Sequence, residues 1–223
     1  MDKCMLCQEN VNKRRSFTDL IFLKNKTNTI CTECMTKFEK VSNSEKSCQR
    51  CCKRGTEKIC KDCLRWEKEG YIVDHHSLYS YNQQMMEYIS RYKFHGDYYL
   101  RMVFATELRK ALKKWPDYTI VPIPLSDKRY KDRGFNQVIG LLEGAGVPYK
   151  SILKKEHSEK QSEKTRQERL ATKQSFYIDE GEKIRDKILL VDDIYTTGAT
   201  LKLARELFVK NDEKIVKTFS LAR

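Results

Sequence analysis

The 223-residue sequence predicts an α/β domain with a parallel sheet, preceded by a small cysteine-rich zinc-binding module. Two short apolar runs, 120–123 and 188–191, are typical of strands buried on both faces of a sheet. All nine cysteines precede residue 64, so the composition changes abruptly along the chain. We therefore expect a module over residues 1–70 and an α/β domain over residues 71–223.

The first 64 residues carry four C-x-x-C pairs. Two such pairs can bring four thiolates to one tetrahedral zinc ion. We expect sequential pairing, the first pair with the second and the third with the fourth, with cross-pairing as the alternative. Cys52 is the ninth thiol, either a replacement ligand or a small buried apolar side chain. The expected ligands, in one or two structural zinc sites, are Cys4, Cys7, Cys31, Cys34, Cys48, Cys51, Cys60 and Cys63.

This segment has too few apolar residues for a core of its own, so bound metal should supply much of its folding free energy. Two roles are left open for it: a scaffold or protein contact, and nucleic-acid binding. Lysines and arginines near the cysteines favour the second role only weakly. The net charge of +13, of which residues 1–70 carry +6, suits an acidic partner such as nucleic acid or polyphosphate.

No apolar run reaches membrane-spanning length, and the first residues do not resemble a signal peptide. Reduced cysteines that bind metal are typical of cytoplasmic proteins. We therefore expect a cytoplasmic protein without a transmembrane segment.

From residue 71 the pattern predicts one or two strands and then a helix capped by Asn82. A second helix is expected from an N-cap at Asp97 to about residue 115. His75 and His76 are expected at the surface of a hairpin rather than at a metal. Lys93 is expected at a solvated helix end, with contact to a phosphate as the alternative.

The stretch 119–137 predicts a buried strand, a turn at Ser126 and a loop with four cations. The turn N–H groups and the cations, Arg129 among them, could bind phosphate oxygens, or the loop could simply be a solvated edge. Asn136 should cap the helix that follows. Beyond it we expect a strand within 147–155, a polar stretch over 157–176 that is either a mobile loop or an exposed helix, and two strands, 175–179 and 215–222, that complete the sheet.

The stretch 187–201 organises the rest of the domain. Its apolar run ends in two adjacent carboxylates, Asp192 and Asp193. A turn rich in threonine follows and leads into an amphipathic helix. Backbone N–H groups at such a turn, together with the helix dipole, favour a bound phosphate. The acids can accept hydrogen bonds from sugar hydroxyls or hold a magnesium ion.

The stretch LLVDDIYTTGATL resembles the phosphoribosyl-pyrophosphate (PRPP) loop of type I phosphoribosyltransferases. With the cysteine pairs and the stretches KFHGD, VPIPLSDKRYKDRGFNQ and QSEKTRQERL, it makes the whole chain similar to the ComF-type competence proteins and their GntX relatives. The resemblance implies a Rossmann-like type I phosphoribosyltransferase domain after an N-terminal zinc module. It also implies a role in natural transformation, the handling of incoming single-stranded DNA beside a competence helicase, inside the cell or at the inner face of its membrane.

Carried over residue by residue, the resemblance implies that Asp192 and Asp193 contact the ribose hydroxyls of Mg²⁺-PRPP. Ser126 and Arg129 would hold the pyrophosphate. Arg166, with Lys164 and Arg169, would neutralise the leaving pyrophosphate from a lid. The 5′-phosphate would lie against Thr196, Thr197, Gly198, Ala199 and Thr200.

Two classes of function remain open. As a Mg²⁺-dependent glycosyltransferase, the protein would transfer phosphoribose to an unknown acceptor. As a catalytically inactive PRPP sensor or DNA-binding adaptor, it would dock a competence helicase.

Overall fold

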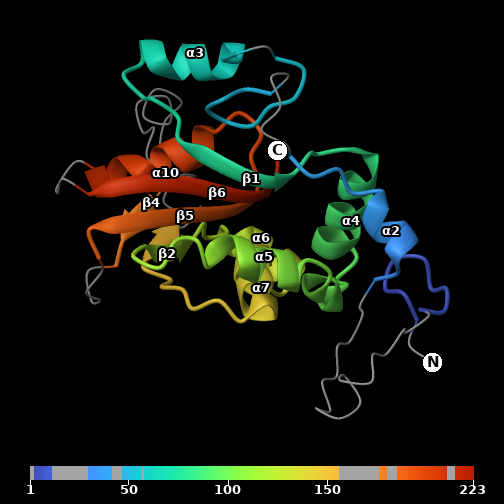
Figure 1. Cartoon of the computed structure of the whole chain (residues 1–223). Coiled ribbons are helices and arrows are strands. Elements are labelled where there is room, and N and C mark those ends of the chain that lie inside the picture. Colours follow the sequence, from blue (N-terminus) through green and yellow to red (C-terminus); the bar gives the residue numbers. More distant parts are fainter. Residues whose placement is uncertain are drawn as a thin grey trace.

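Four parallel strands form the central sheet of the computed structural model, which describes residues 3–11, 30–41, 47–56, 58–155, 176–179, 185–209 and 214–223. The strand order is β1-β6-β5-β2 (Figure 1). The carboxyl ends of parallel strands share one edge of the sheet, which is where such sheets bind ligands. Because all four strands are parallel and helices lie beside the sheet, the predicted α/β fold with a parallel sheet is confirmed. The strands are β1 (His75–Tyr79), β2 (Thr119–Pro122), β5 (Lys187–Ile194) and β6 (Ile215–Ala222).

The sheet separates two hydrophobic clusters, and β5 contributes to both. Leu189 and Val191 belong to the first cluster, whereas Ile188 and Leu190 belong to the second. Successive side chains of a strand point to opposite faces, so a strand covered on both faces must be apolar throughout. This is why the apolar run at 188–191 predicted the central strand correctly.

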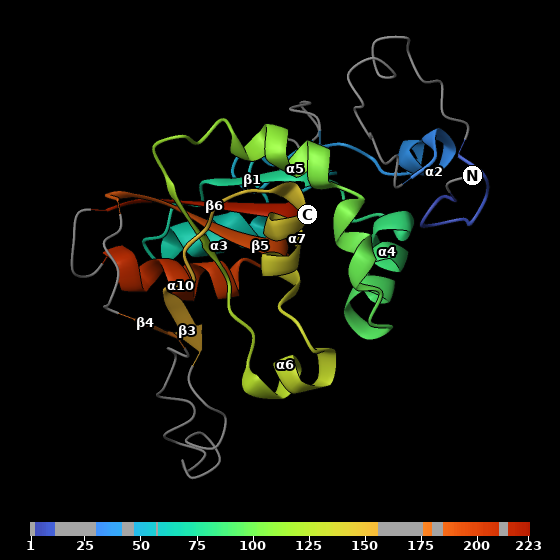
Figure 2. The ribbon, with the colours of Figure 1, turned by 90° about the horizontal axis from the view of Figure 1, so that it is seen from below.

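Helices on one side of the sheet build the first cluster (Figure 1). Asn82 caps α4 as predicted, accepting a hydrogen bond from Met85 N–H at 3.0 Å. Figure 2 shows α4 beyond the carboxyl edge of the sheet, near the C-terminus. The elements are α4 (Gln83–Phe94), η1 (Tyr98–Met102), α5 (Ala105–Leu112) and α7 (Gln137–Ala145).

The prediction of one helix from Asp97 to about residue 115 is wrong. A 3-10 turn, η1, is followed by a break at Val103 and Phe104 and then by α5. Asp97 makes no side-chain capping bond, because its carboxylate accepts a hydrogen bond from Arg91 at 3.0 Å instead.

The second cluster lies under α10 (Ala199–Val209) and a separate antiparallel hairpin, β3 (Leu153–Lys155) with β4 (Phe176–Ile178). The prediction that the segment 175–179 completes the central sheet is therefore wrong. Phe176 is buried in the second cluster and β4 packs on α10, so the hairpin lies against this helix and not in the central sheet. The prediction for β6 is confirmed, since it pairs with both β5 and β1.

His75 is buried, contrary to the prediction that it lies at the surface of a hairpin. β1 is a parallel strand, and its alternation turns His75 toward β6. There its ring nitrogens lie 2.9 Å from the Thr218 hydroxyl and 3.0 Å from the Ser220 hydroxyl. Burial is the main cause that lowers the pKa of His75, so the ring is neutral. The exposed neighbour, His76, fits the prediction.

The cysteine-rich segment contains two short helices, α2 (Thr32–Thr36) and α3 (Lys61–Lys68). It shares the cores of the α/β domain rather than forming its own. Phe38, after α2, is part of the first cluster, and Trp66 on α3 is part of the second. Among the residues that the structure describes, no helix is both long and apolar enough to cross a membrane.

Candidate functional site

The two acids lie at the carboxyl end of β5, and local backbone bonds orient both. Asp193 N–H donates to the Asp192 carboxylate and Ile194 N–H to the Asp193 carboxylate, each at 2.9 Å. Asp193 is buried and forms an ion pair with Lys93 from the last turn of α4. Asp192 is half-buried and has no ion pair with another described residue. Burial first, and then repulsion by Asp193, raises the pKa of Asp192 well above its ordinary value.

The threonine-rich loop follows directly and leads into α10. The side chains of Thr196, Thr197 and Thr200 are exposed, whereas Gly198 is buried and has a φ of +85°. The Thr197 hydroxyl accepts a hydrogen bond from Ala199 N–H at 3.4 Å. The N–H groups of Thr196, Thr197 and Gly198 donate to no acceptor within the described residues. The loop can therefore offer backbone donors and hydroxyls to an anion at the start of a helix.

The basic stretch after β2 is a helix, so the prediction of a basic loop is wrong. It forms α6 (Asp127–Arg133), whose N-cap Ser126 accepts a hydrogen bond from Arg129 N–H at 3.5 Å. Helix formation follows from this cap and from Gly134, which ends α6 with a φ of +80°. Arg129 is exposed, and Ser126 is partly buried.

Two lysines at the acid pair were not assigned to the site from the sequence. Lys93 is paired with Asp193 and is not at a solvated helix end, since only 15% of its side chain is exposed. Lys155 on β3 is influenced by Asp192 and Arg129: burial first, then Arg129, lowers its pKa, while Asp192 opposes that change. The sequence offered phosphate contact only as the alternative for Lys93 and did not single out Lys155, because neither lysine lies near the acids in sequence.

Arg133 at the end of α6 completes this group of cations. It donates to the Lys93 carbonyl at 3.1 Å and to the Gln137 side chain. Burial lowers its pKa, and Asp193 partly offsets that effect. The expected lid residues Lys164, Arg166 and Arg169 lie outside the described residues.

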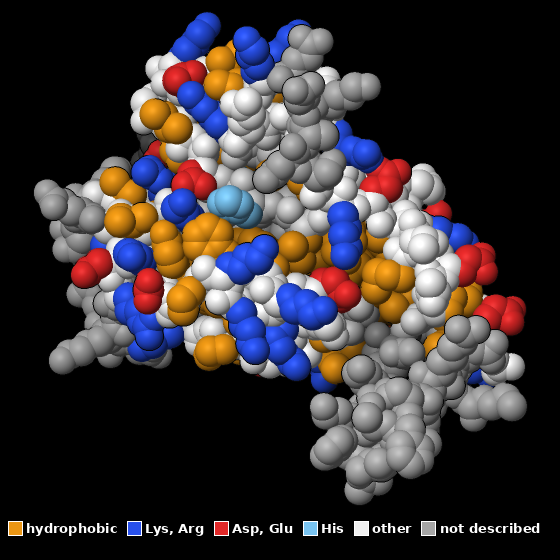
Figure 3. Space-filling model, viewed as in Figure 1, with side chains coloured by type: hydrophobic (Ala, Val, Ile, Leu, Met, Phe, Trp, Pro, Cys, Tyr) orange, Lys and Arg blue, Asp and Glu red, His pale blue; other side chains and the backbone are white. Residues whose placement is uncertain are grey.

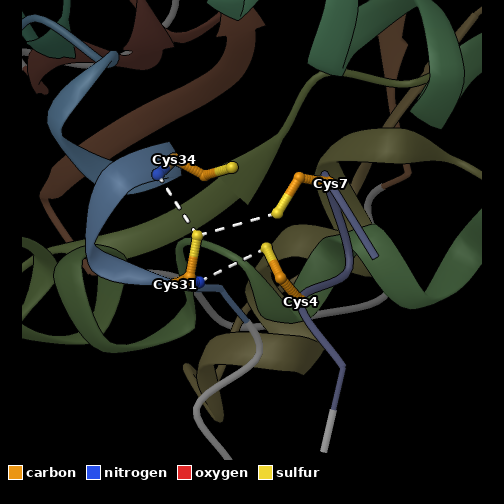
Figure 4. Close-up of side chains that lie close together, drawn as sticks. All are labelled: Cys4, Cys7, Cys31 and Cys34. Atoms are coloured by element: carbon orange, nitrogen blue, oxygen red, sulfur yellow. Dashed lines mark hydrogen bonds between the residues drawn. The ribbon is translucent and has the colours of Figure 1, made fainter. Parts of the chain in front are cut away.

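The eight expected cysteine ligands form two groups of four, paired sequentially as predicted. In each group the sulfur atoms lie within 4.8 Å of one another (Figure 4 shows the first). The Cys7–Cys31 and Cys48–Cys63 sulfurs are both 3.8 Å apart. A tetrahedral site with Zn–S bonds of 2.3 Å requires a spacing of about 3.8 Å. Both groups therefore fit a zinc ion.

The two groups repeat the same local structure. Lys3–Asn10 and Ser47–Arg54 form matching bridges, and Cys31 and Cys60 cap α2 and α3 with the same φ of −74° and ψ of 160°. The residues after the first pair of each group, Gln8 and Cys52, share a φ of +63°. Cys52 therefore forms the turn after Cys51 and is not one of the four clustered cysteines of the second group. Its thiol donates to the His75 carbonyl at 3.5 Å.

Comparison with known proteins shows the family of the chain. Over 221 residues the chain is 45% identical to "Competence protein ComFC" of Streptococcus pneumoniae (strain ATCC BAA-255 / R6), covering 99% of this chain and 100% of that protein. The chain belongs to the ComFC family. It is also 33% identical to "Competence protein ComFC" of Bacillus subtilis (strain 168), over 99% of the chain and 94% of that relative.

A more distant ComF relative and a domain match extend this assignment. "Competence protein F" of Haemophilus influenzae (strain ATCC 51907 / DSM 11121 / KW20 / Rd) is 28% identical over 74% of the chain and 78% of its own length. Residues 133–223 match the family described as "Phosphoribosyl transferase domain". That range holds the acid pair, the threonine-rich loop and α10. The predicted resemblance to ComF-type competence proteins is thus confirmed.

Proposed function

We propose that this ComFC-family protein acts in natural transformation and binds Mg²⁺-PRPP at the carboxyl edge of its sheet, while it handles incoming single-stranded DNA. The observation that carries the proposal is the loop at 196–200, which follows the two acids and leads into α10 and whose first N–H groups have no acceptor in the described part of the chain. The loop would hold the 5′-phosphate, and Asp192 with Asp193 would hold the ribose hydroxyls and Mg²⁺.

The cations around the acids suit the pyrophosphate group of PRPP. Arg129 and Arg133 come from α6 and Lys155 from β3, and these cations act electrostatically on the acids or on one another. Lys93 is paired with Asp193, so Asp193 would exchange this partner for the ribose or Mg²⁺ on binding. Ser126, at the start of α6, would supply its hydroxyl and the N–H groups near it.

As an enzyme, the protein would catalyse Mg²⁺-dependent transfer of phosphoribose to a nitrogen nucleophile, with release of pyrophosphate. Positioning and charge stabilisation would provide most of the rate enhancement. Arg166 would contribute from the lid. The alternative is a catalytically inactive PRPP sensor that docks a competence helicase as an adaptor, and the same site would serve it.

We propose that two structural zinc ions stabilise the module at residues 1–70, and that residues 71–223 form the phosphoribosyltransferase-like domain. Four closely spaced sulfurs in each group support the metal assignment. Because the cysteines are suited to metal rather than to disulfides, we also propose a cytoplasmic location, free or at the inner face of the membrane.

A basic surface with aromatic side chains supports the nucleic-acid part of the proposal. Trp115 lines two hollows of about 480 and 510 Å³. Lys113 and Arg185 line the first, whereas Lys110 and Lys114 line the second, which also contains Glu107. Figure 3 shows lysines and arginines around apolar surface on this face. Cations with aromatic rings are the chemistry that holds single strands.

The acid pair provides the first test. Asp192→Asn should weaken Mg²⁺-PRPP binding at least about tenfold, because a charge-assisted hydrogen bond and a metal ligand are lost. Asp193→Asn should weaken it too, but it also frees Lys93. Calorimetry with PRPP on the zinc-loaded full chain measures both effects. Asp117→Asn is the matched control, since the side chain of this acid is 74% exposed and pairs with Lys187 alone among the described residues. Equal affinities in all three variants would contradict the proposal.

Pyrophosphate release then separates the two classes of function. Release from PRPP with one member of a nucleobase panel, lost in Asp192→Asn, would support the transferase. Tight PRPP binding without release for any base would support the sensor.

A further inference from the structure

The second cysteine group, which is Cys48, Cys51, Cys60 and Cys63, is attached to the backbone of the threonine-rich loop. Trp66 on α3 donates its indole N–H to the Thr197 carbonyl at 2.7 Å. Trp66 is only 5% exposed, and the two residues are 131 positions apart in sequence. On α10, the Lys202 ammonium lies 4.9 Å from the centre of the Trp66 ring and 2.9 Å from the Glu69 carboxylate. These contacts join α3 to the first turn of α10.

Arg223 makes the second attachment. Its guanidinium donates to the carbonyls of Tyr195 and Thr196, and to the Cys51 sulfur at 3.4 Å. It also lies 3.5 Å from the Asp62 carboxylate, and only 9% of its side chain is exposed. One buried cation therefore bridges a cysteine of the second group and the loop.

Together, Arg223 and Trp66 hold three consecutive carbonyls, those of Tyr195, Thr196 and Thr197. In a planar trans peptide the C=O and the next residue's N–H point in opposite directions. Carbonyls that are held toward the cysteine module therefore turn the N–H groups of residues 196–198 away from it. These are the N–H groups that have no acceptor among the described residues.

We propose that Trp66 and Arg223 are positioning residues that aim the amides of residues 196–198 at the bound phosphate. Metal in the second cysteine group, by fixing α3 and Cys51, then raises the affinity of the loop for sugar phosphate. This coupling rests on the proposed function of the loop. By linkage, bound sugar phosphate strengthens the retention of that metal by the same factor.

Trp66→Phe tests the coupling, because it keeps an aromatic ring in the core while it removes the indole N–H donor. Trp115→Phe is the matched control at the other tryptophan. On the zinc-loaded full chain, Trp66→Phe should weaken PRPP binding about three- to tenfold, the effect of one lost hydrogen bond. Hydrogen exchange at Tyr195 and Lys202, whose N–H groups donate to the carbonyls of Ala222 and Gly198 at 2.9 Å, should become faster without any ligand present. Trp115→Phe should change neither quantity.

A chelator challenge tests the reciprocal effect. PRPP should slow the release of one of two zinc equivalents from the wild-type protein, and this protection should be reduced in Trp66→Phe. The first cysteine group makes no contact with residues 195–202 among the described residues, so its zinc serves as the internal reference.

The outcomes separate this inference from the function on which it rests. If the wild-type protein binds no sugar phosphate, the proposed function is overturned. Faster exchange in Trp66→Phe, but not in Trp115→Phe, would still support the inference that Trp66 fixes the loop backbone. If loop exchange and PRPP affinity in Trp66→Phe match those of Trp115→Phe, the inference is overturned and the proposed function stands.

Discussion

Gly198 is the residue on which the shape of the threonine-rich loop depends most directly. Its φ of +85° is in the left-handed region, and a Cβ built there would collide with the Tyr195 hydroxyl. Tyr195 cannot easily move aside, because it is 2% exposed and its ring lies 4.2 Å from the ring of His75. Glycine is therefore required for both backbone and packing reasons.

Gly198→Ala should lower the free energy of unfolding by about 3 kcal/mol, because left-handed strain adds to overpacking. Gly70→Ala is the control, since Gly70 has a φ of +77° but open space around it. That control should cost only about 1–2 kcal/mol. Chemical denaturation of both variants measures the difference. Equal losses would mean that Tyr195 relaxes freely and that only the backbone requires glycine.

At the scale of elements, the helix caps position the edge of the site. Asn136 caps α7 by accepting hydrogen bonds from Val138 N–H at 2.8 Å and Ile139 N–H at 3.2 Å. Its amide also donates at 3.1 Å to the carbonyl of Ile123, the residue that directly follows β2. One buried side chain thus fixes α7 to the strand that precedes α6. The sequence predicted the cap but gave no indication of the bond to the strand.

Asn136→Ala should cost about 2–3 kcal/mol in the free energy of unfolding, since it removes a cap and leaves a buried carbonyl without a partner. Asn82→Ala provides the comparison. Asn82 caps α4 in the same way but is only half-buried, and its loss should cost about 1 kcal/mol. Urea titrations would measure both. A cost for Asn82→Ala as large as that for Asn136→Ala would show that burial of the cap is unimportant.

At the scale of the molecule, the charge of +13 has to be assigned to a surface before it can support the proposed nucleic-acid binding. The candidates are the face around Trp115 and the cysteine module. Both carry exposed lysines that form no ion pair with a described residue: Lys113 and Lys114 beside Trp115, and Lys61 and Lys68 on α3.

Reversing two charges on each surface distinguishes these candidates. We expect Lys113→Glu with Lys114→Glu to weaken binding of an oligo-dT strand about tenfold or more, and to reduce the slope of log affinity against log salt by about 1–2. Lys61→Glu with Lys68→Glu makes the same charge change on α3 and should have a smaller effect. Fluorescence anisotropy at several salt concentrations measures both. The opposite order would assign the strand to the cysteine module, and PRPP affinity should be unchanged in either variant.

The sequence by itself determined the features that depend on local order. Four cysteine pairs, an apolar run that ends in Asp192 and Asp193, and a threonine-rich turn before a helix are each set by neighbouring residues, so the zinc groups, β5 and the loop could be predicted. Asn82 and Asn136 were predictable as caps for the same reason.

Only the tertiary structure decided which distant side chains meet at these features. Lys93 reaches Asp193 because α4 lies beyond the carboxyl edge of the sheet, and Trp66 and Arg223 reach the loop because the second cysteine group shares a core with α10. The hairpin of β3 and β4 formed apart from the central sheet for the same kind of reason, since Phe176 is buried beside that helix. Such contacts depend on how layers pack around a sheet, and no local pattern in the sequence records that packing.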